Sequence, residues 1–139
     1  MRNYIFKLVL TILLCCTTGN VAFSQSSFNW TKIINAIAIV ESNNNPKAVG
    51  GGGSVGLLQI TPVLVKDCNK ILQKKNKSKR YSLADRYNAE KSKEMFIIIQ
   101  EYYNPQHNVE KAIRLWNGGP KYSVKSTQRY YNKVRKHLA

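Results

Sequence analysis

The sequence predicts a single all-α domain that contains at most one small β-hairpin. Apolar residues recur at the three- and four-residue spacing of a buried helix face in five separate segments. Each segment is bounded by residues that begin or end helices, such as Asn-Pro or Gly-Gly-Pro. The sequence lacks the regular alternation of strand and helix patterns that a doubly wound fold requires. A length of 139 residues suits one domain.

The chain begins with the pattern of a secretory signal peptide. Arg2 and Lys7 flank a short polar start, residues 8–16 are almost wholly apolar, and Ala22-Phe23-Ser24 offers the small residues of a cleavage site. We therefore predict a signal peptide at residues 1–24. The apolar run of about nine residues is shorter than the roughly 20 that span a bilayer, so an uncleaved membrane anchor is the less favoured alternative.

The predicted signal peptide implies an exported protein of the periplasm or cell envelope, with a mature domain at residues 25–139. Lipid attachment at Cys15 or Cys16 is less favoured, because neither follows the small residue of a lipoprotein cleavage site. Cys68 alone remains in the mature chain, so we expect no internal disulfide even in an oxidising compartment. Its place on an apolar stripe predicts a core residue rather than a reactive thiol.

The mature domain is strongly basic. Two of the 22 Lys and Arg residues lie in the signal peptide, which leaves 20 positive against 7 negative side chains, a formal charge of +13. Such an excess favours an anionic partner. Because an exported protein seldom meets nucleic acid, we expect no nucleic-acid partner and favour the acidic peptides and polymers of a bacterial cell wall.

The first predicted helix begins at a cap at Asn29 or Thr31 and ends at the SNNNP stretch of residues 42–46. Between Val49 and Ile60, the glycine and β-branched content predicts the small hairpin. The apolar face of this first helix consists of Ile33, Ile34, Ile37 and Val40.

Two longer helices follow. Thr61-Pro62 provides a cap and a first helical residue, and the basic KKNKSKR stretch at residues 74–80 predicts a loop after that helix. Ser82 and Asp85 have the spacing of a capping box, and Asn88 caps the next helix, which Asn104-Pro105 ends. The predicted apolar stripes are Leu64, Cys68, Ile71 and Leu72 on the earlier helix, then Ser92, Met95, Phe96, Ile99 and Tyr103 on the later one.

The last two predicted helices are short. Asn108 caps a helix that continues through Ile113 and Trp116 until Gly118-Gly119-Pro120 terminates it. The final helix is predicted to begin at Ser126 or Thr127, and its apolar face holds Tyr130, Val134 and Leu138.

Glu41 is the candidate catalytic residue that helical spacing singles out. Ile34, Ile37 and Glu41 are three and four residues apart, so they share one helix face and the carboxyl group is directed toward the core. Loss of hydration there raises the pKa of a carboxyl group and lets it donate a proton near neutral pH. The alternative is a glutamate at a frayed helix end, with its carboxylate in water.

Four short motifs together resemble the soluble lytic transglycosylase family. They are ES at residues 41–42, GLLQITP at 56–62, LWNGGP at 115–120 and TQRYYNKV at 127–134, in the order of the family's motifs. The resemblance implies a lysozyme-like helical domain. It also implies cleavage of the β-1,4 bond between N-acetylmuramic acid and N-acetylglucosamine in peptidoglycan, for which we expect neither a cofactor nor a metal.

By this resemblance Glu41 is the sole catalytic carboxyl group. It protonates the glycosidic oxygen and then, as a base, takes the proton of the sugar's own 6-hydroxyl, which leaves a 1,6-anhydro product. Trp116 stands where the family more often has tyrosine, which keeps an apolar surface for sugar and loses a hydroxyl. The positions that match substrate-binding residues of the family are Ser42, Gly56, Gln59, Trp116, Asn117 and Tyr130.

The roles of these residues differ. Tyr130 is expected to reach toward Glu41 and the sugar, whereas Gly56 is expected to let the backbone pass close to the substrate. The Ser42 hydroxyl could instead satisfy the backbone at the helix end, and Gln59 could instead face solvent. The glycines at residues 50–53 suggest a more mobile lip to the cleft.

Two other functions remain open at this point. A hydrolytic muramidase needs a second carboxyl group about 5 to 9.5 Å from the first, and Asp85 is the best candidate, although a capping role explains it. A cationic wall-binding protein with an inactive Glu41 is the other alternative.

Small members of the family often open the wall locally, so a secretion, conjugation or other envelope-spanning assembly is an expected partner. The acids predicted to lie elsewhere are Asp67, off the apolar stripe, and Glu90, Glu94, Glu101 and Glu110, on solvated faces.

Overall fold

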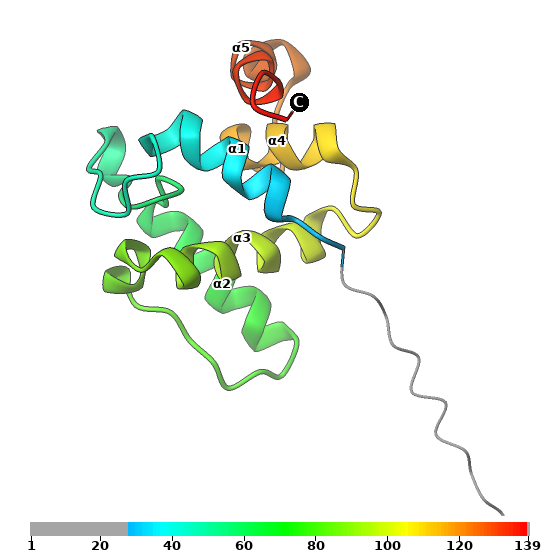
Figure 1. Cartoon of the computed structure of the whole chain (residues 1–139). Coiled ribbons are helices and arrows are strands. Elements are labelled where there is room, and N and C mark those ends of the chain that lie inside the picture. Colours follow the sequence, from blue (N-terminus) through cyan, green and yellow to red (C-terminus); the bar gives the residue numbers. More distant parts are fainter. Residues whose placement is uncertain (1–27, 139) are drawn as a thin grey trace, which may run out of the picture.

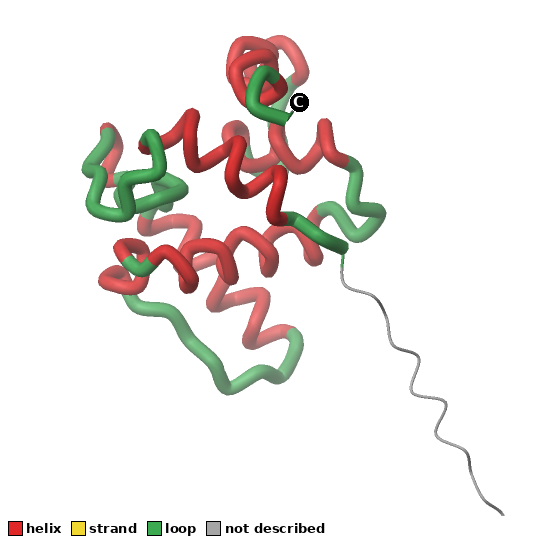
Figure 2. The backbone as a smooth tube through the Cα atoms, viewed as in Figure 1, coloured by secondary structure: helices red, strands yellow, loops and turns green. Residues whose placement is uncertain are grey.

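Five amphipathic helices make up most of residues 28–138, the part of the chain that the computed structural model describes (Figure 1). Figure 2 shows helices and loops in this part, and no strand. The predicted all-α, lysozyme-like domain is therefore confirmed, whereas the predicted signal peptide at residues 1–24 lies outside the described residues. The helices are α1 (Thr31–Ser42), α2 (Pro62–Lys74), α3 (Ala89–Tyr103), α4 (Val109–Gly118) and α5 (Val124–Arg135), with short 3-10 turns at Gly51–Gly53 and Leu83–Tyr87.

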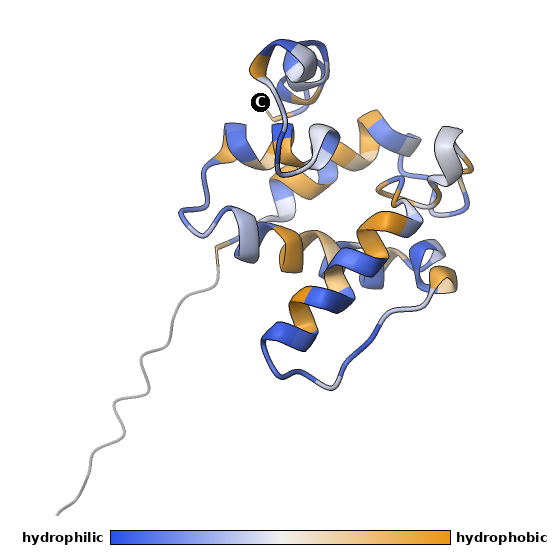
Figure 3. Ribbon diagram, turned by 180° about the vertical axis from the view of Figure 1, so that it is seen from behind, coloured by the Kyte–Doolittle hydropathy of each residue, from blue (hydrophilic) through white to orange (hydrophobic). Residues whose placement is uncertain are grey.

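The core lies between two groups of helices. Figure 1 shows α4 and α5 on one side of α1, and α2 and α3 on the other. Seen from behind in Figure 3, α2 alternates apolar and polar turns, as expected for a helix with one buried face. Side chains from the predicted apolar stripes are almost fully buried, including Ile37, Cys68, Met95, Phe96 and Ile113.

The predicted hairpin is reduced to two isolated antiparallel bridges, Val49 with Val55 and Val55 with Ile60. Glycines and tight turns between these residues leave too few successive residues in extended conformation to build a ladder. The segment therefore forms a compact loop that packs Leu58 and Ile60 into the core, both fully buried.

Polar side chains cap the helices from α2 onward, mostly where the sequence predicted them. The cap predicted for the first helix at Asn29 or Thr31 is wrong, because the cap position of α1 is Trp30, which makes no side-chain cap bond. Thr61, Asn88 and Asn108 each accept a hydrogen bond from the backbone three residues later. The predicted start of the last helix at Ser126 or Thr127 is wrong, because the Ser123 hydroxyl accepts the Ser126 N–H at 3.1 Å. This bond caps α5 and makes Val124 its first residue.

Arg86, which no sequence pattern marked, braces the loop between α1 and α2. Its guanidinium is buried and donates to the carbonyl oxygens of Gly53 at 2.8 Å and Ile60 at 3.2 Å. A third bond, from Nε to Leu83 O at 2.8 Å, fixes the side chain to its own 3-10 turn. One buried side chain thus ties two points of the loop at residues 43–61, which we call the glycine loop, to the turn that precedes α3.

Gly56 allows the loop to pack against the backbone of Arg86. Its φ of +81° lies in the left-handed region, and a Cβ atom placed there would be 1.9 Å from the Arg86 carbonyl oxygen. Residue 56 must therefore be glycine because the loop packs against the protein's own backbone, whereas the sequence predicted a close approach to the substrate.

Gly56→Ala is expected to destabilise the domain by about 2 to 4 kcal/mol, because it combines a left-handed φ with an overpacked contact. Urea unfolding monitored by circular dichroism measures this loss. Gly51→Ala is the matched control, since a Cβ atom there meets nothing within 4 Å, and its change should stay within about 0.5 kcal/mol. Equal stability of the two variants would show that the contact with Arg86 does not constrain residue 56.

Candidate active-site cleft

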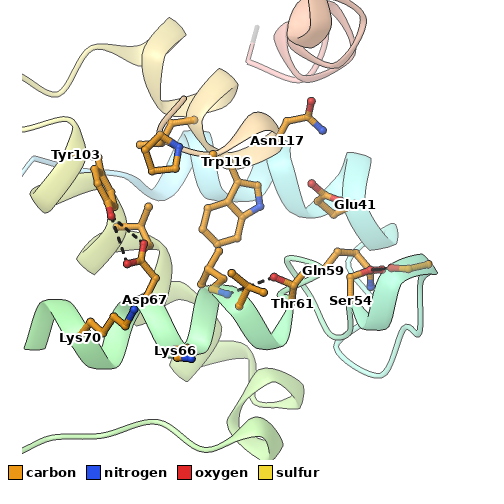
Figure 4. Close-up of a pocket in the computed structure, with 17 residues that line it drawn as sticks. Glu41, Ser54, Gln59, Thr61, Lys66, Asp67, Lys70, Tyr103, Trp116 and Asn117 are labelled. Atoms are coloured by element: carbon orange, nitrogen blue, oxygen red, sulfur yellow. Dashed lines mark hydrogen bonds between the residues drawn. The ribbon is translucent and has the colours of Figure 1, made fainter. Parts of the chain in front are cut away.

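A cleft of about 740 Å³ lies between the end of α1, the glycine loop, α2 and the ends of α3 and α4 (Figure 4). Its wall combines apolar surface with a few polar groups, as in most sites for small or polymeric ligands. The cleft brings together four of the predicted site residues: Glu41, Gln59, Trp116 and Asn117.

Glu41 lies in the last turn of α1 and lines one end of the cleft (Figure 4). Asn43 ends the helix in a left-handed conformation with φ of 52°, as the SNNNP stretch predicted. Burial raises the pKa of the Glu41 carboxyl above its usual range, and a hydrogen bond from Tyr130 partly offsets this effect. The carboxyl group is therefore held in the protein wall and keeps its proton to a higher pH than a glutamate in water.

Tyr130 reaches Glu41 from α5, as predicted. Its hydroxyl donates to Glu41 Oε1 at 2.6 Å. Burial, together with the adjacent carboxylate, raises the pKa of Tyr130, so the phenol stays protonated and remains a donor. This bond is stronger when Glu41 is ionised, which makes Tyr130 a stabiliser of the carboxylate form.

Arg114 holds α5 in the position that this contact requires, although no motif marked it. From α4 its guanidinium donates to Val124 O and Thr127 Oγ1, both at 3.1 Å, and to Gln128 Oε1 at 2.9 Å. Its Nε pairs with Glu110 at 2.7 Å. Since the side chain is buried, these bonds act in a poorly hydrated setting, and Arg114 positions the helix that carries Tyr130.

Gln59 lines the cleft in a defined orientation. Its backbone has a positive φ of 50°, and its amide group bonds Gly56 O at 3.0 Å and the Ser54 hydroxyl at 3.0 Å. A Cβ atom on Gly50 would lie 2.0 Å from Gln59 Oε1, so glycine at residue 50 makes room for this amide. The alternative in which Gln59 faces solvent is therefore disfavoured.

Trp116 and Asn117 form the wall opposite α2. The Trp116 indole N–H donates to Leu58 O at 3.2 Å, and the ring packs against Phe96 with centroids 5.0 Å apart. These two contacts fix the plane of the ring, whose remaining surface lines the cleft together with the exposed Asn117. A fixed indole beside a free amide suits a sugar, which has both apolar faces and hydroxyl groups.

Ser42 and Gly56 belong to the framework beneath the cleft and do not line it. The Ser42 hydroxyl donates to Leu57 O at 2.7 Å and accepts the Asn45 N–H at 3.1 Å. These bonds favour the alternative in which Ser42 satisfies backbone groups at the helix end. Both residues thus shape the loop that carries Gln59, and their contact with substrate stays a prediction.

Asp67 is a second carboxyl group in the cleft, although the sequence predicted only that it lies off the apolar stripe of its helix. Figure 4 shows it at the opposite end from Glu41, where the Tyr103 hydroxyl donates to it at 3.0 Å. Asp67 lies four residues after Val63 and three residues before Lys70, so the three side chains share a second face of α2. That face was detectable, but nothing local showed that it borders a cleft.

Asp85 has the capping role that the sequence predicted and does not line the cleft. Its carboxylate accepts the Ser82 N–H at 2.7 Å and pairs with Lys91 at 2.6 Å. The bond from Lys91 is the main reason that the pKa of Asp85 lies below its usual range. Both oxygens are occupied, so the geometry offers no support for Asp85 as a catalytic base.

The remaining potential sites in residues 28–138 are structural. Cys68 is fully buried, and burial raises the pKa of its thiol to about 12, in agreement with a core role. Among these residues, no group of three or more His, Cys, Asp or Glu side chains lies close enough together to bind a metal ion. Over the same part of the chain, no helix has the length and apolar character needed to cross a membrane.

Comparison with known families agrees with the motifs. The family described as the transglycosylase SLT domain matches residues 22–138, nearly the whole chain. Its members are peptidoglycan lytic transglycosylases. No curated protein sequence matches this chain.

Tyr130→Phe is expected to raise the pKa of Glu41 further, because the lost hydrogen bond is the interaction that lowers it. NMR titration of the ¹³C-labelled Glu41 carboxyl measures the shift. Tyr102→Phe, which removes a hydroxyl bonded to Lys74 outside the cleft, is the control and should leave the titration unchanged. A lower pKa in Tyr130→Phe would mean that the bond favours the protonated acid.

Proposed function

The chain belongs to the transglycosylase SLT domain family, and we propose that it cleaves peptidoglycan glycan strands by lytic transglycosylation with Glu41 as the single catalytic carboxyl group. Peptidoglycan is the substrate that the family implies. The observation that carries the proposal is the Glu41 carboxyl at the cleft wall, with a raised pKa and a 2.6 Å hydrogen bond from Tyr130.

In the first step Glu41 acts as the acid. Its protonated carboxyl donates to the glycosidic oxygen while the bond from that oxygen to C1 of N-acetylmuramic acid breaks. The raised pKa supports this role because it keeps the proton on Glu41 to a higher pH than on a glutamate in water. As the carboxylate forms, the Tyr130 hydroxyl stabilises the new charge.

In the second step the same carboxylate acts as the base. It accepts the proton of the muramic acid 6-hydroxyl while that oxygen bonds to C1, which closes the 1,6-anhydro ring and returns Glu41 to its acid form. No water is consumed. The nucleophile belongs to the same sugar, and intramolecular groups of this kind reach effective concentrations of about 10⁵ to 10⁸ M.

The distribution of the other carboxyl groups supports this one-acid reaction. Among the described residues, Asp67 is the one other acid that lines the cleft, and it lies at the far end in a hydrogen bond with Tyr103 (Figure 4). Asp85 is held by Ser82 and Lys91. A hydrolase would need a carboxylate beside the bond to activate water, so the muramidase alternative has no candidate near Glu41.

The surface charge supports action at an acidic wall. Helix α5 and its flanking residues expose six basic side chains, and residues 119–138 contain no acid. We propose that this surface contacts acidic wall components, that the protein is exported by its N-terminal segment, and that it works beside an envelope-spanning assembly that needs the wall opened. The basic residues are Lys121, Lys125, Arg129, Lys133, Arg135 and Lys136.

Glu41→Gln is expected to lower the rate of wall cleavage by at least about 10²- to 10⁴-fold, because an amide of similar shape cannot supply the proton. Release of soluble fragments from purified, dye-labelled peptidoglycan measures the rate. If the variant keeps more than about a tenth of the activity, Glu41 is not the acid.

The stability of the same variant separates lost chemistry from lost folding. Because the folded state raises the pKa of Glu41 above 4.5, wild-type stability falls as pH rises from that value through the folded pKa. Glutamine does not titrate, so Glu41→Gln should gain stability relative to wild type as pH rises from about 4.5 through the folded pKa of Glu41. If the protein only binds the wall, wild type and Glu41→Gln should co-sediment with insoluble peptidoglycan to the same extent, and neither should release soluble fragments.

Fragments released by the wild-type protein are expected to end in 1,6-anhydro-N-acetylmuramic acid. Each should be lighter by one water than the corresponding hydrolytic fragment and should lack a reducing end, because the 6-hydroxyl replaces water as nucleophile. Mass spectrometry of a peptidoglycan digest measures this directly, with a lysozyme digest as reference. Predominantly reducing ends would reject the transglycosylase proposal in favour of a muramidase.

A further inference from the structure

The end of the cleft farthest from Glu41 carries charged side chains of both signs. Lys66, Asp67 and Lys70 all lie on α2 and line this end, and Tyr103 faces them from the end of α3 (Figure 4). The end at Glu41, in contrast, combines one buried carboxyl group with amide and indole groups. The two ends therefore suit different chemical parts of a ligand.

Lys66 and Lys70 border a second hollow as well as the cleft. This hollow, of about 430 Å³, lies on the other side of α2 and is also lined by Asn69, Gln73 and Arg80. The two lysines thus form a ridge between the hollows. We call Lys66, Asp67 and Lys70 the α2 ridge.

Neither lysine of the ridge is neutralised within the part of the chain that the structure describes. No salt bridge or hydrogen bond to an acid involves either ammonium group, while four other basic residues have such partners. Positions 66 and 70 are one helical turn apart, so the like charges repel each other. An anionic group bound between them would remove this repulsion.

Asp67 places an oriented carboxyl group beside the two lysines. The Tyr103 hydroxyl donates to both of its oxygens, at 3.0 and 3.3 Å. Burial and this hydrogen bond raise the pKa of Tyr103 to about 12, so the phenol remains a donor. With its carboxylate oriented in this way, Asp67 can also accept a hydrogen bond from an ammonium or amide group.

The glycan backbone of peptidoglycan has no charge that would match this ridge. Its sugars are N-acetylated, and the carboxyl of the lactyl group is used in the amide bond to the stem peptide. The stem peptide carries the charges, with free carboxylates and the second amino group of its diamino acid. Both signs occur within a few residues, as they do on the ridge.

We propose that the α2 ridge binds the stem peptide of the substrate, with Lys66 and Lys70 on its carboxylates and Asp67 on an ammonium or amide group. The inference rests on the proposed function, since it places the glycan in the cleft against Trp116. From there the peptide crosses α2 between the two lysines and enters the second hollow, where Arg80 offers another cation.

The test compares Lys66→Ala/Lys70→Ala with wild type on two forms of one substrate. One is intact peptidoglycan, and the other is the same glycan after an amidase has removed the stem peptides and the freed lactyl carboxyl groups have been converted to methylamides. Exposed charge pairs contribute modestly, so the double variant should raise KM on intact peptidoglycan by about two- to thirtyfold with little change in kcat. The rise in KM on peptide-free strands should be clearly smaller.

The matched control is Lys75→Ala/Lys77→Ala, which removes the same charge from the exposed loop after α2. A general effect of net charge would give both double variants the same loss, and this result would overturn the proposal. An equal loss of Lys66→Ala/Lys70→Ala on both substrates would overturn it as well, because the lysines would then contact glycan. Asp67→Asn should change the preference between peptides with free and acetylated amino groups.

A binding measurement separates this inference from the proposed function. Chemical shifts of the folded protein are followed while a soluble stem tetrapeptide is added to wild type and to Lys66→Ala/Lys70→Ala. Shifts centred on α2 that weaken in the double variant support the ridge even if wild type cleaves neither substrate, which would reject the transglycosylase proposal alone. Absence of such shifts at millimolar peptide rejects the ridge, whatever the protein cleaves.

Discussion

The hydrogen bond from Tyr130 to Glu41 is the contact on which the catalytic end of the cleft depends. It joins the last turn of α1 to the middle of α5, two elements that are remote in sequence. Burial raises the pKa of the carboxyl group and the tyrosine lowers it, so their balance sets how readily Glu41 gives up and regains a proton. A group that acts first as acid and then as base needs both forms to be accessible.

Two buried arginines brace the elements around the cleft. Arg114 fastens α5 to α4 through Val124, Thr127 and Gln128, while Arg86 fastens the glycine loop through Gly53 and Ile60. A guanidinium suits this task, because its several donors in one plane can satisfy several acceptors at once. Replacing either residue would remove several of these hydrogen bonds at once.

Local patterns predicted the helices, their caps and Glu41, because helix periodicity and capping depend on residues within one or two turns. The roles of Arg86, Arg114 and Asp67 depend on segments that meet only in the folded chain, and no local pattern reports such meetings. The early start of α5 is a different case, because its cap is local: Ser123, a residue type that often caps helices, lies three residues before Ser126. The sequence predicted that a close approach requires glycine at residue 56, but the group that lies close to it is the carbonyl of Arg86 and not the substrate.

The separation of charge along the cleft follows from the chemistry of Glu41. A lysine beside this carboxyl would favour its ionised form, lower its pKa and remove the proton that the proposed first step needs. Burial and the hydrogen bond from Tyr130 account for the shifted pKa of Glu41, and no lysine contributes to it. A basic protein that acts on an acidic polymer must therefore place its cations away from the acid. The α2 ridge and the surface of α5 satisfy this constraint, since they put positive charge where substrate can meet it without changing the protonation of Glu41.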